Sequence, residues 1–153
     1  MPLTHDLLLV HASMTLALAG VMWVIQLTIV PRLVRATPET WPHHVRVYRG
    51  IYLALFWPLV VIEGGSGIGV ALLHPAGIPQ WLHGINLGLL LCAWITVPVT
   101  RYAVGHGPVD RFHPEGFRKF ARLNWIRVAV WTGRSAVVLT MLHLAAEARP
   151  GLP

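Results

Sequence analysis

The feature that most constrains this chain is a set of four uninterrupted apolar segments, each long enough to cross a lipid bilayer. They cover residues 7–30, 51–73, 81–100 and 123–146. A helix of roughly 20 apolar residues spans the hydrocarbon core of a membrane. In a chain of 153 residues, of which 55% are apolar and only 12% are charged, too little polar surface would remain to enclose four such segments in water. The sequence therefore predicts an all-α polytopic membrane protein, a single domain over residues 1–153 built as a four-transmembrane-helix bundle.

The charged residues outside these segments predict how the bundle is oriented. Most of the Lys and Arg lie in residues 31–50 and 101–122, whereas residues 1–6 and the linker 74–80 contain none. Basic residues gather in short loops on the cytoplasmic side of a membrane. We therefore expect the basic loops on the cytoplasmic side of the membrane and both termini and the 74–80 linker on the outer side.

The net charge of +6 follows from this distribution and does not indicate nucleic-acid binding. The expected partners of the basic loops are instead the anionic lipids of the bilayer. Membrane-protein partners or a homo-oligomer are both compatible with the apolar exterior, and the sequence does not choose between them.

Three charged residues interrupt the apolar segments, namely Glu63, Arg127 and Arg134. At about 1.5 Å per residue, Glu63 and Arg134 lie roughly 18 and 16 Å from the basic ends of their segments. An arginine near the membrane centre costs at least about 2.5–3.5 kcal/mol and requires a partner. Glu63 is the only acid in these segments, so we expect it to face Arg134 inside the bundle, directly or through one water.

A second set of polar residues at matching depth lies closer to the basic ends. Arg127 is level with Gln26 and Asn124, and we expect it to bond to one of these or to a carbonyl at a helix end. Intramembrane polar groups either fix the register of a bundle or line a functional site. Both outcomes remain open, the second being a pocket for an acidic or carbonyl-bearing ligand. The candidate residues for either role are Glu63, Arg134, Gln26, Arg127 and Asn124.

Histidine is unusually frequent, with nine in the chain, and each apolar segment has one near its outer end. Met14 follows His11 by three residues and lies on the same helix face. The candidates for a metal or haem site are therefore His11, Met14, His74, His83 and His143. Imidazoles from facing helices hold haem or a soft metal such as copper. For a shared metal ion, at least two ring nitrogens should lie within about 4 Å of each other. The alternative is a set of interfacial histidines without any ligand, because their spacings match no short metal motif.

The second apolar segment contains the glycine-rich stretch EGGSGIG at residues 63–69. Gly65 and Gly69 have the small-xxx-small spacing that lets helix backbones approach each other closely. We expect this face to pack against a neighbouring helix.

The polar and aromatic residues form a pattern that resembles a known family. The pattern is Trp23-x-x-Gln26, Val30-Pro31, Arg49-x-x-Tyr52, Glu63, and Asn124-Trp125-x-Arg127 followed by Trp131-x-x-Arg134. It is similar, over nearly the whole chain, to a family of small, uncharacterised bacterial four-helix integral membrane proteins. The last helix carries the most specific part of the pattern. The resemblance implies the fold and implies no activity.

Better-known membrane families share fewer features with the chain. Four-helix protoporphyrinogen oxidases (HemJ-type) have an early His, a Gly and a Pro-Arg-Leu, like His11, Gly20 and Pro31-Arg32-Leu33, and a Trp-Leu-His like Trp81-Leu82-His83. The chain departs from them at residues 84–88, which lack their lysine, and at residues 122–124, where Arg-x-x-Asn is one residue short. CopD-type copper-resistance domains share the His…Gly…Pro opening, and the outward His/Met set would suit copper. Anthrone-oxygenase-like four-helix proteins are similar more faintly.

Three functions remain open from the sequence. The first is a protein that binds haem or a metal at the outward histidines, with a redox or transfer role. The second is an accessory or assembly subunit of a larger membrane complex, without chemistry of its own. The third is an enzyme or carrier for a lipophilic ligand bound near Glu63 and Arg134.

Overall fold

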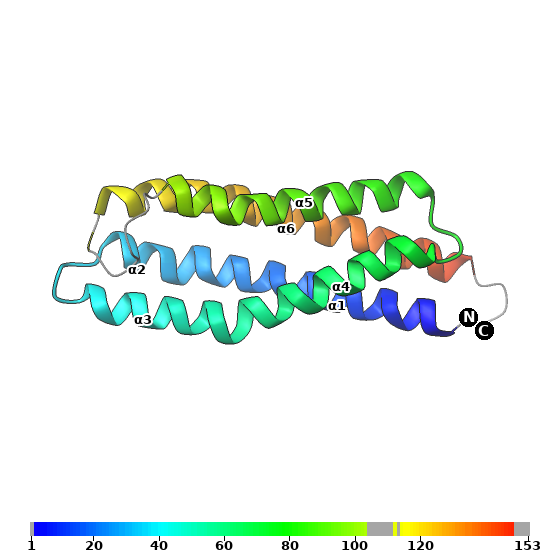
Figure 1. Cartoon of the computed structure of the whole chain (residues 1–153), viewed down its shortest axis with the longest axis horizontal. Coiled ribbons are helices and arrows are strands. Elements are labelled where there is room, and N and C mark those ends of the chain that lie inside the picture. The colour runs from blue at the N-terminus through cyan, green and yellow to red at the C-terminus, as the bar shows by residue number, and fades with distance from the viewer. Residues whose placement is uncertain (1, 104–111, 113, 149–153) are drawn as a thin grey trace.

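The described part of the chain, residues 2–103, 112 and 114–148 of a computed structural model, is almost entirely helical. No strand occurs in it. In chain order the elements are α1 (Pro2–Val24), η1 (Ile25–Ile29), α2 (Val30–Val34), α3 (Trp41–Ile51), η2 (Tyr52–Phe56), α4 (Trp57–Leu73), α5 (Gln80–Ala103) and α6 (Pro114–Glu147). α1, η1 and α2 are consecutive parts of one long helix, as are α3, η2 and α4 (Figure 1).

Four helices in this part are long and apolar enough to cross a membrane, which confirms the predicted all-α four-helix bundle. They are Thr4–Val34, Trp41–Leu73, Gln80–Val99 and Glu115–Glu147. The first, second and fourth extend beyond the predicted apolar segments, because their ends continue as amphipathic helix. α3, for example, buries Trp41 and Val45 in the core.

The bundle is apolar on its outside, and its largely apolar interior encloses a smaller set of buried polar and charged side chains. Every spanning helix exposes large apolar side chains, such as Leu27 (60% exposed), Val61 (66%), Leu91 (60%) and Ile126 (52%). Arg134, by contrast, is completely buried. Such a surface is favourable in lipid and costly in water, since contiguous apolar patches of this extent are rare on soluble proteins. The distribution agrees with a chain that lies in a membrane.

The two ends of the bundle differ in charge. Figure 1 places the start of α1, the α4–α5 connection and the end of α6 together, and the α2–α3 connection at the opposite end. We call the latter the basic end; its described basic residues are Arg32, Arg35, Arg46, Arg49, Arg118, Lys119 and Arg122. α1 packs against both α4 and α6, whereas α5 packs mainly against α6 and less extensively against α4.

Two π-helical turns, η1 and η2, interrupt the first and second helices toward the basic end. Pro31 follows η1 and Pro58 follows η2, each near the start of the next α-helical part. A proline ring clashes with the carbonyl four residues earlier, here the carbonyls of Leu27 and Ala54 inside the π turns. The wider π turn relieves this clash while the chain remains helical.

The glycine-rich stretch of α4 packs against α1, although not as its spacing predicts. Gly65 faces open space, so the prediction is wrong for this residue. The close contacts are at Gly67, where an added Cβ would lie 2.9 Å from Cε1 of His11, and at Gly69, where it would lie 2.8 Å from Cδ2 of Leu7. The glycines therefore make room for side chains of α1.

Gly67→Ala should lower the stability of the protein, while Gly65→Ala should not. The methyl group at residue 67 meets the enclosed ring of His11, and overpacking of this kind costs about 1–3 kcal/mol. At residue 65 the methyl group meets nothing within 4 Å, and the change only raises helix propensity, by up to about 1 kcal/mol. Thermal unfolding of both variants in the same detergent measures the difference. Equal melting temperatures would contradict this account of the α1–α4 contact.

Candidate functional site

Glu63 of α4 and Arg134 of α6 form an ion pair inside the bundle. Nη2 of Arg134 contacts Oε1 of Glu63, and both side chains are 0% exposed. The predicted pairing of these two residues is therefore confirmed, and of the two expected forms, direct or through one water, the structure shows the direct one. Burying two charges is costly, and their attraction offsets this cost only when hydrogen bonds satisfy the remaining polar atoms. The groups around the pair decide what the pair can do.

α1 adds two polar side chains to this ion pair. Oγ1 of Thr15 donates to Oε1 of Glu63 at 3.3 Å. Nδ1 of His11 lies 3.7 Å from the same carboxylate oxygen and 3.3 Å from Oγ of Ser66. Because Oγ of Ser66 donates its proton to the carbonyl of Glu63 at 3.0 Å, it accepts from Nδ1 of His11.

α5 completes the arrangement through Asn86. Its Nδ2 lies 3.0 Å from Nε2 of His11, and its Oδ1 accepts from Nη2 of Arg134 at 3.4 Å. An amide nitrogen only donates, so Nε2 of His11 is the acceptor and the ring is neutral, with its proton on Nδ1. All four spanning helices thus contribute to one cluster. We call it the Glu63 centre; it consists of His11, Thr15, Glu63, Ser66, Asn86 and Arg134.

Three buried atoms of the central ion pair have no hydrogen-bond partner within the described part of the chain, namely Oε2 of Glu63 and Nε and Nη1 of Arg134. The guanidinium carbon lies 5.1 Å from the ring centre of Trp131, so a cation–π contact covers one face of it. Buried donors and acceptors are normally paired, and unpaired atoms of charged groups are costly. Together the three atoms offer one acceptor beside two donors, which is a binding arrangement for a small polar group.

A second polar layer lies about two turns nearer the basic end. Nδ2 of Asn124 donates to Oε1 of Gln26 at 2.7 Å, so these two residues of matching depth bond to each other. The predicted partners of Arg127 are wrong. Its Nη2 donates to the hydroxyl of Tyr52 at 2.9 Å, and its guanidinium carbon lies 5.7 and 5.3 Å from the ring centres of Tyr52 and Phe56. Tyr52 stands at the start of its apolar segment, where an aromatic residue is expected in the interfacial belt, so nothing in the sequence marked it as a partner.

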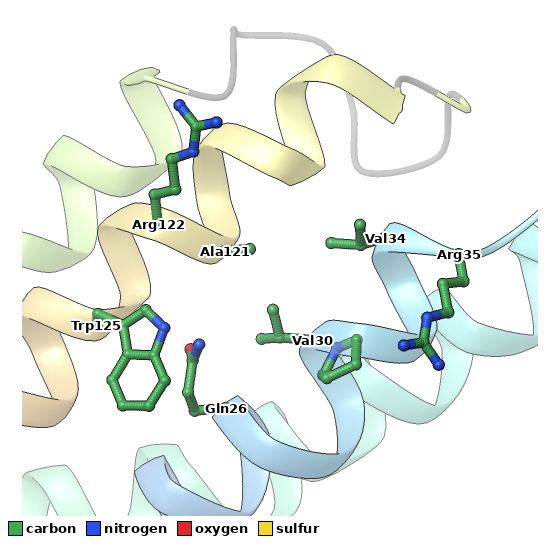
Figure 2. A pocket seen from close by; sticks show the side chains of 8 residues that line it. Gln26, Val30, Val34, Arg35, Ala121, Arg122 and Trp125 are labelled. Carbon is green, nitrogen blue, oxygen red and sulfur yellow. The ribbon is translucent and has the colours of Figure 1, made fainter.

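A groove opens beside this second layer, between the first helix and α6 (Figure 2). Its volume is about 290 Å³. The residues that line it are Gln26, Val30, Pro31, Val34, Arg35, Ala121, Arg122 and Trp125. Figure 2 shows Gln26 and Trp125 close together on one side and Arg122 farther along α6. The groove therefore borders the second layer and includes no residue of the Glu63 centre.

The structure separates the histidines that the sequence proposed as one cluster. His11 belongs to the Glu63 centre, and Met14, one turn further along α1, is half-buried. His143 is exposed and pairs with a glutamate of its own helix at 3.3 Å. Only His74 and His83 approach each other, with ring centroids 5.2 Å apart. Among the residues that the structure describes, no three His, Cys, Asp or Glu side chains are grouped to hold a metal ion.

Sequence reasoning missed Thr15, Ser66 and Asn86 as members of the centre. Hydroxyl side chains in apolar helices commonly bond to the preceding turn, as Thr15 also does with the carbonyl of His11 at 2.9 Å. They therefore carry little signal. Asn86 was the detectable one, because it is the only amide side chain in its apolar segment.

No protein-family model matches the chain, and no curated protein or solved structure matches it either.

Replacing one member of the central ion pair should destabilise the protein more than replacing both. Glu63→Gln or Arg134→Gln alone leaves a buried charge uncompensated, which costs about 3–5 kcal/mol. In the double variant no buried charge of the pair remains, so we expect a coupling energy of about 1–3 kcal/mol. Thermal unfolding in detergent measures all three variants, with the exposed Arg118→Gln as a control for the loss of a positive charge. Additive losses would contradict the pairing.

Proposed function

We propose that this chain is an integral membrane protein that binds a lipophilic ligand at the Glu63 centre, as an enzyme or a carrier. The observation that supports this most is the set of unpaired atoms on the buried ion pair, Oε2 of Glu63 and Nε and Nη1 of Arg134. Intramembrane ionisable residues commonly mark substrate or ion pathways. A contact that only fixes the register of the helices has no need of free donors and a free acceptor. The separation of the outward histidines favours this function over a haem or copper site built from all of them.

The head of the ligand should be neutral and should carry both an O–H donor and an acceptor oxygen. The O–H group would donate to Oε2 of Glu63, and the oxygen would accept from Nε or Nη1 of Arg134. The ion pair is neutral overall, and a third charge in this interior would be costly to desolvate. Phenols, quinols and hydroxy-ketones with apolar bodies have this combination.

We expect the ligand to enter from the bilayer through the seam between α4 and α5. α5 packs less extensively against α4 than against α6. Next to Glu63 the seam is closed by Trp94, whose Cζ2 would lie 2.8 Å from a Cβ atom at Gly64. Trp94 is 46% exposed on the outside of the bundle. A rotation of this one side chain would open a route toward the Glu63 centre.

The wild-type protein in detergent should bind a long-chain alkylphenol more tightly than the methyl ether of the same phenol. The ether keeps the ring and the tail but lacks the O–H donor for Oε2 of Glu63. A hydrogen bond to a charged group contributes about 1.5–3 kcal/mol, so Kd should differ by about tenfold or more. Isothermal titration calorimetry measures both ligands. Equal affinities, or no binding of the phenol, would rule out the proposal.

Arg134→Lys tests the same site without removing its charge. The lysine remains cationic opposite Glu63 but lacks the planar fork that carries Nε and Nη1, so the affinity for the phenol should fall. Arg118→Lys, on the exposed basic end, is the matched control and should bind like the wild type. Circular dichroism and gel filtration check that both variants are folded. If folded Arg134→Lys binds the phenol as tightly as the wild type, the guanidinium is not the binding group.

We place the basic end in the cytoplasm of a bacterial inner membrane, with the start of α1, the α4–α5 connection and the end of α6 on the periplasmic side. The charge difference between the two ends of the bundle supports this orientation. A periplasm-active reporter fused after α6 should be active, and one inserted in the α2–α3 connection should be inactive. The reverse pattern would overturn the orientation and leave the geometry of the Glu63 centre untouched.

A further inference from the structure

His83 of α5 is a buried histidine, and neither of its ring nitrogens has a hydrogen-bond partner among the described residues. It is 4% exposed, and both Nδ1 and Nε2 are unpaired. A neutral imidazole carries one donor and one acceptor, and each unpaired buried group costs about 1–3 kcal/mol. A histidine in this state indicates that another group binds to its ring.

A second imidazole, that of His74, lies beside it across the α4–α5 connection. The two ring centroids are 5.2 Å apart, and the ring planes are inclined by 60°. Nδ1 of His74 lies 3.1 Å from the carbonyl oxygen of Leu72. A carbonyl only accepts, so Nδ1 carries the proton and Nε2 keeps its lone pair. A metal-binding histidine typically has this form, in which the other ring nitrogen donates to a backbone carbonyl or a carboxylate.

The backbone of His74 supports a specific role for its side chain. Its φ of 42° and ψ of 70° are left-handed, and no other non-glycine residue in the described part of the chain has a positive φ. Glycine usually occupies this position after a helix, because a Cβ atom there costs about 1–2 kcal/mol. The left-handed turn at His74 places its ring next to that of His83.

We propose that His74 and His83 together bind one late first-row transition-metal ion, with copper preferred over zinc. Imidazole nitrogen suits both metals, and Cu(II) is favoured over Zn(II) in the Irving–Williams order. With metal–nitrogen distances of roughly 2.0–2.1 Å, two imidazoles on one ion have ring centres roughly 4.5 Å apart at the angle of about 90° in tetragonal Cu(II) and roughly 5 Å apart at the tetrahedral angle of Zn(II). The observed spacing of 5.2 Å is therefore close to that of a shared ion, and the preference for copper depends on the Irving–Williams order. Water completes the coordination. The site lies at the end of the bundle opposite the basic end and does not depend on the function proposed for the Glu63 centre.

The test uses full-length protein purified without a polyhistidine tag, stripped with a chelator and titrated with Cu(II) or Zn(II). We expect one Cu(II) per chain, bound more tightly than Zn(II), with nitrogen hyperfine splitting in the electron paramagnetic resonance spectrum. His83→Leu and His74→Gly should each weaken binding at least tenfold, since loss of even an outer-shell partner weakens a site by about 10–100-fold. No binding of either ion by the wild type would overturn the proposal.

His74→Gly separates the metal role from a structural role of the same residue. Glycine relieves the left-handed strain, so the metal-free variant should unfold at the same temperature as the wild type or above it. Added Cu(II) should raise the melting temperature of the wild type and not that of His74→Gly. A metal-free variant that melts well below the wild type would show that the ring is needed for packing and would contradict the assignment.

Two controls detect adventitious binding by other histidines. His143→Ala removes an exposed imidazole at the same end of the bundle, and His43→Ala/His44→Ala removes an adjacent pair at the basic end whose ring centroids are 5.6 Å apart. Both variants should bind Cu(II) like the wild type. If they lose as much binding as His83→Leu does, the ion is held by surface histidines and the proposed site is wrong.

Discussion

The burial of two opposite charges inside an apolar bundle is the constraint on which the rest of this structure depends. Glu63 and Arg134 come from different helices, and neither charge is tolerable there alone. Their contact therefore fixes α4 against α6 in both depth and rotation. Hydrogen bonds through His11 and Asn86 extend this requirement to α1 and α5, because each bond forms at only one register of its helix. Gly67 belongs to the same constraint, since a larger residue would displace the ring of His11.

The second polar layer is built differently, because no acid accompanies its arginine. Arg127 is buried, yet its partners are a phenol hydroxyl and two aromatic faces. Cation–π contacts contribute about 0.5–2 kcal/mol, so the positive charge is only partly compensated. Arg127 lies closer to the end of the bundle than Arg134 does, and a charge is less costly there than near the midplane. The depth of each arginine thus agrees with the kind of partner that it has.

The features that could be predicted from the sequence are those with a single physical solution. Four apolar segments of membrane length allow only a helical bundle, and one acid level with one arginine allows only one pairing.

The sequence does not show as directly how each helix is rotated about its axis or how far it extends beyond its apolar segment. His11 was placed too near the outer end, because α1 begins at Pro2 and extends beyond the apolar segment, so that His11 lies beside Glu63. Asn86 and Tyr52 are uncharged. An uncharged polar side chain in an apolar helix can face another helix, the membrane interface or its own backbone, so the sequence alone does not indicate its partner. Only the packed structure shows which environment each one has.

The π turns also determine how the first and second helices tolerate changes in length. A π turn closes its hydrogen bond one residue later than an α-helical turn, so it accommodates one extra residue while the flanking parts keep their faces. Deleting one residue within η1 or η2 would keep the faces of both flanks aligned, but it would bring back the clash of Pro31 or Pro58 with the carbonyl four residues earlier. A deletion elsewhere in the same helix would rotate every residue beyond it by about 100° relative to its neighbours. Gln26 and Tyr52 lie inside these two turns, so the same π-helical segments that accommodate the prolines also carry the partners of Asn124 and Arg127.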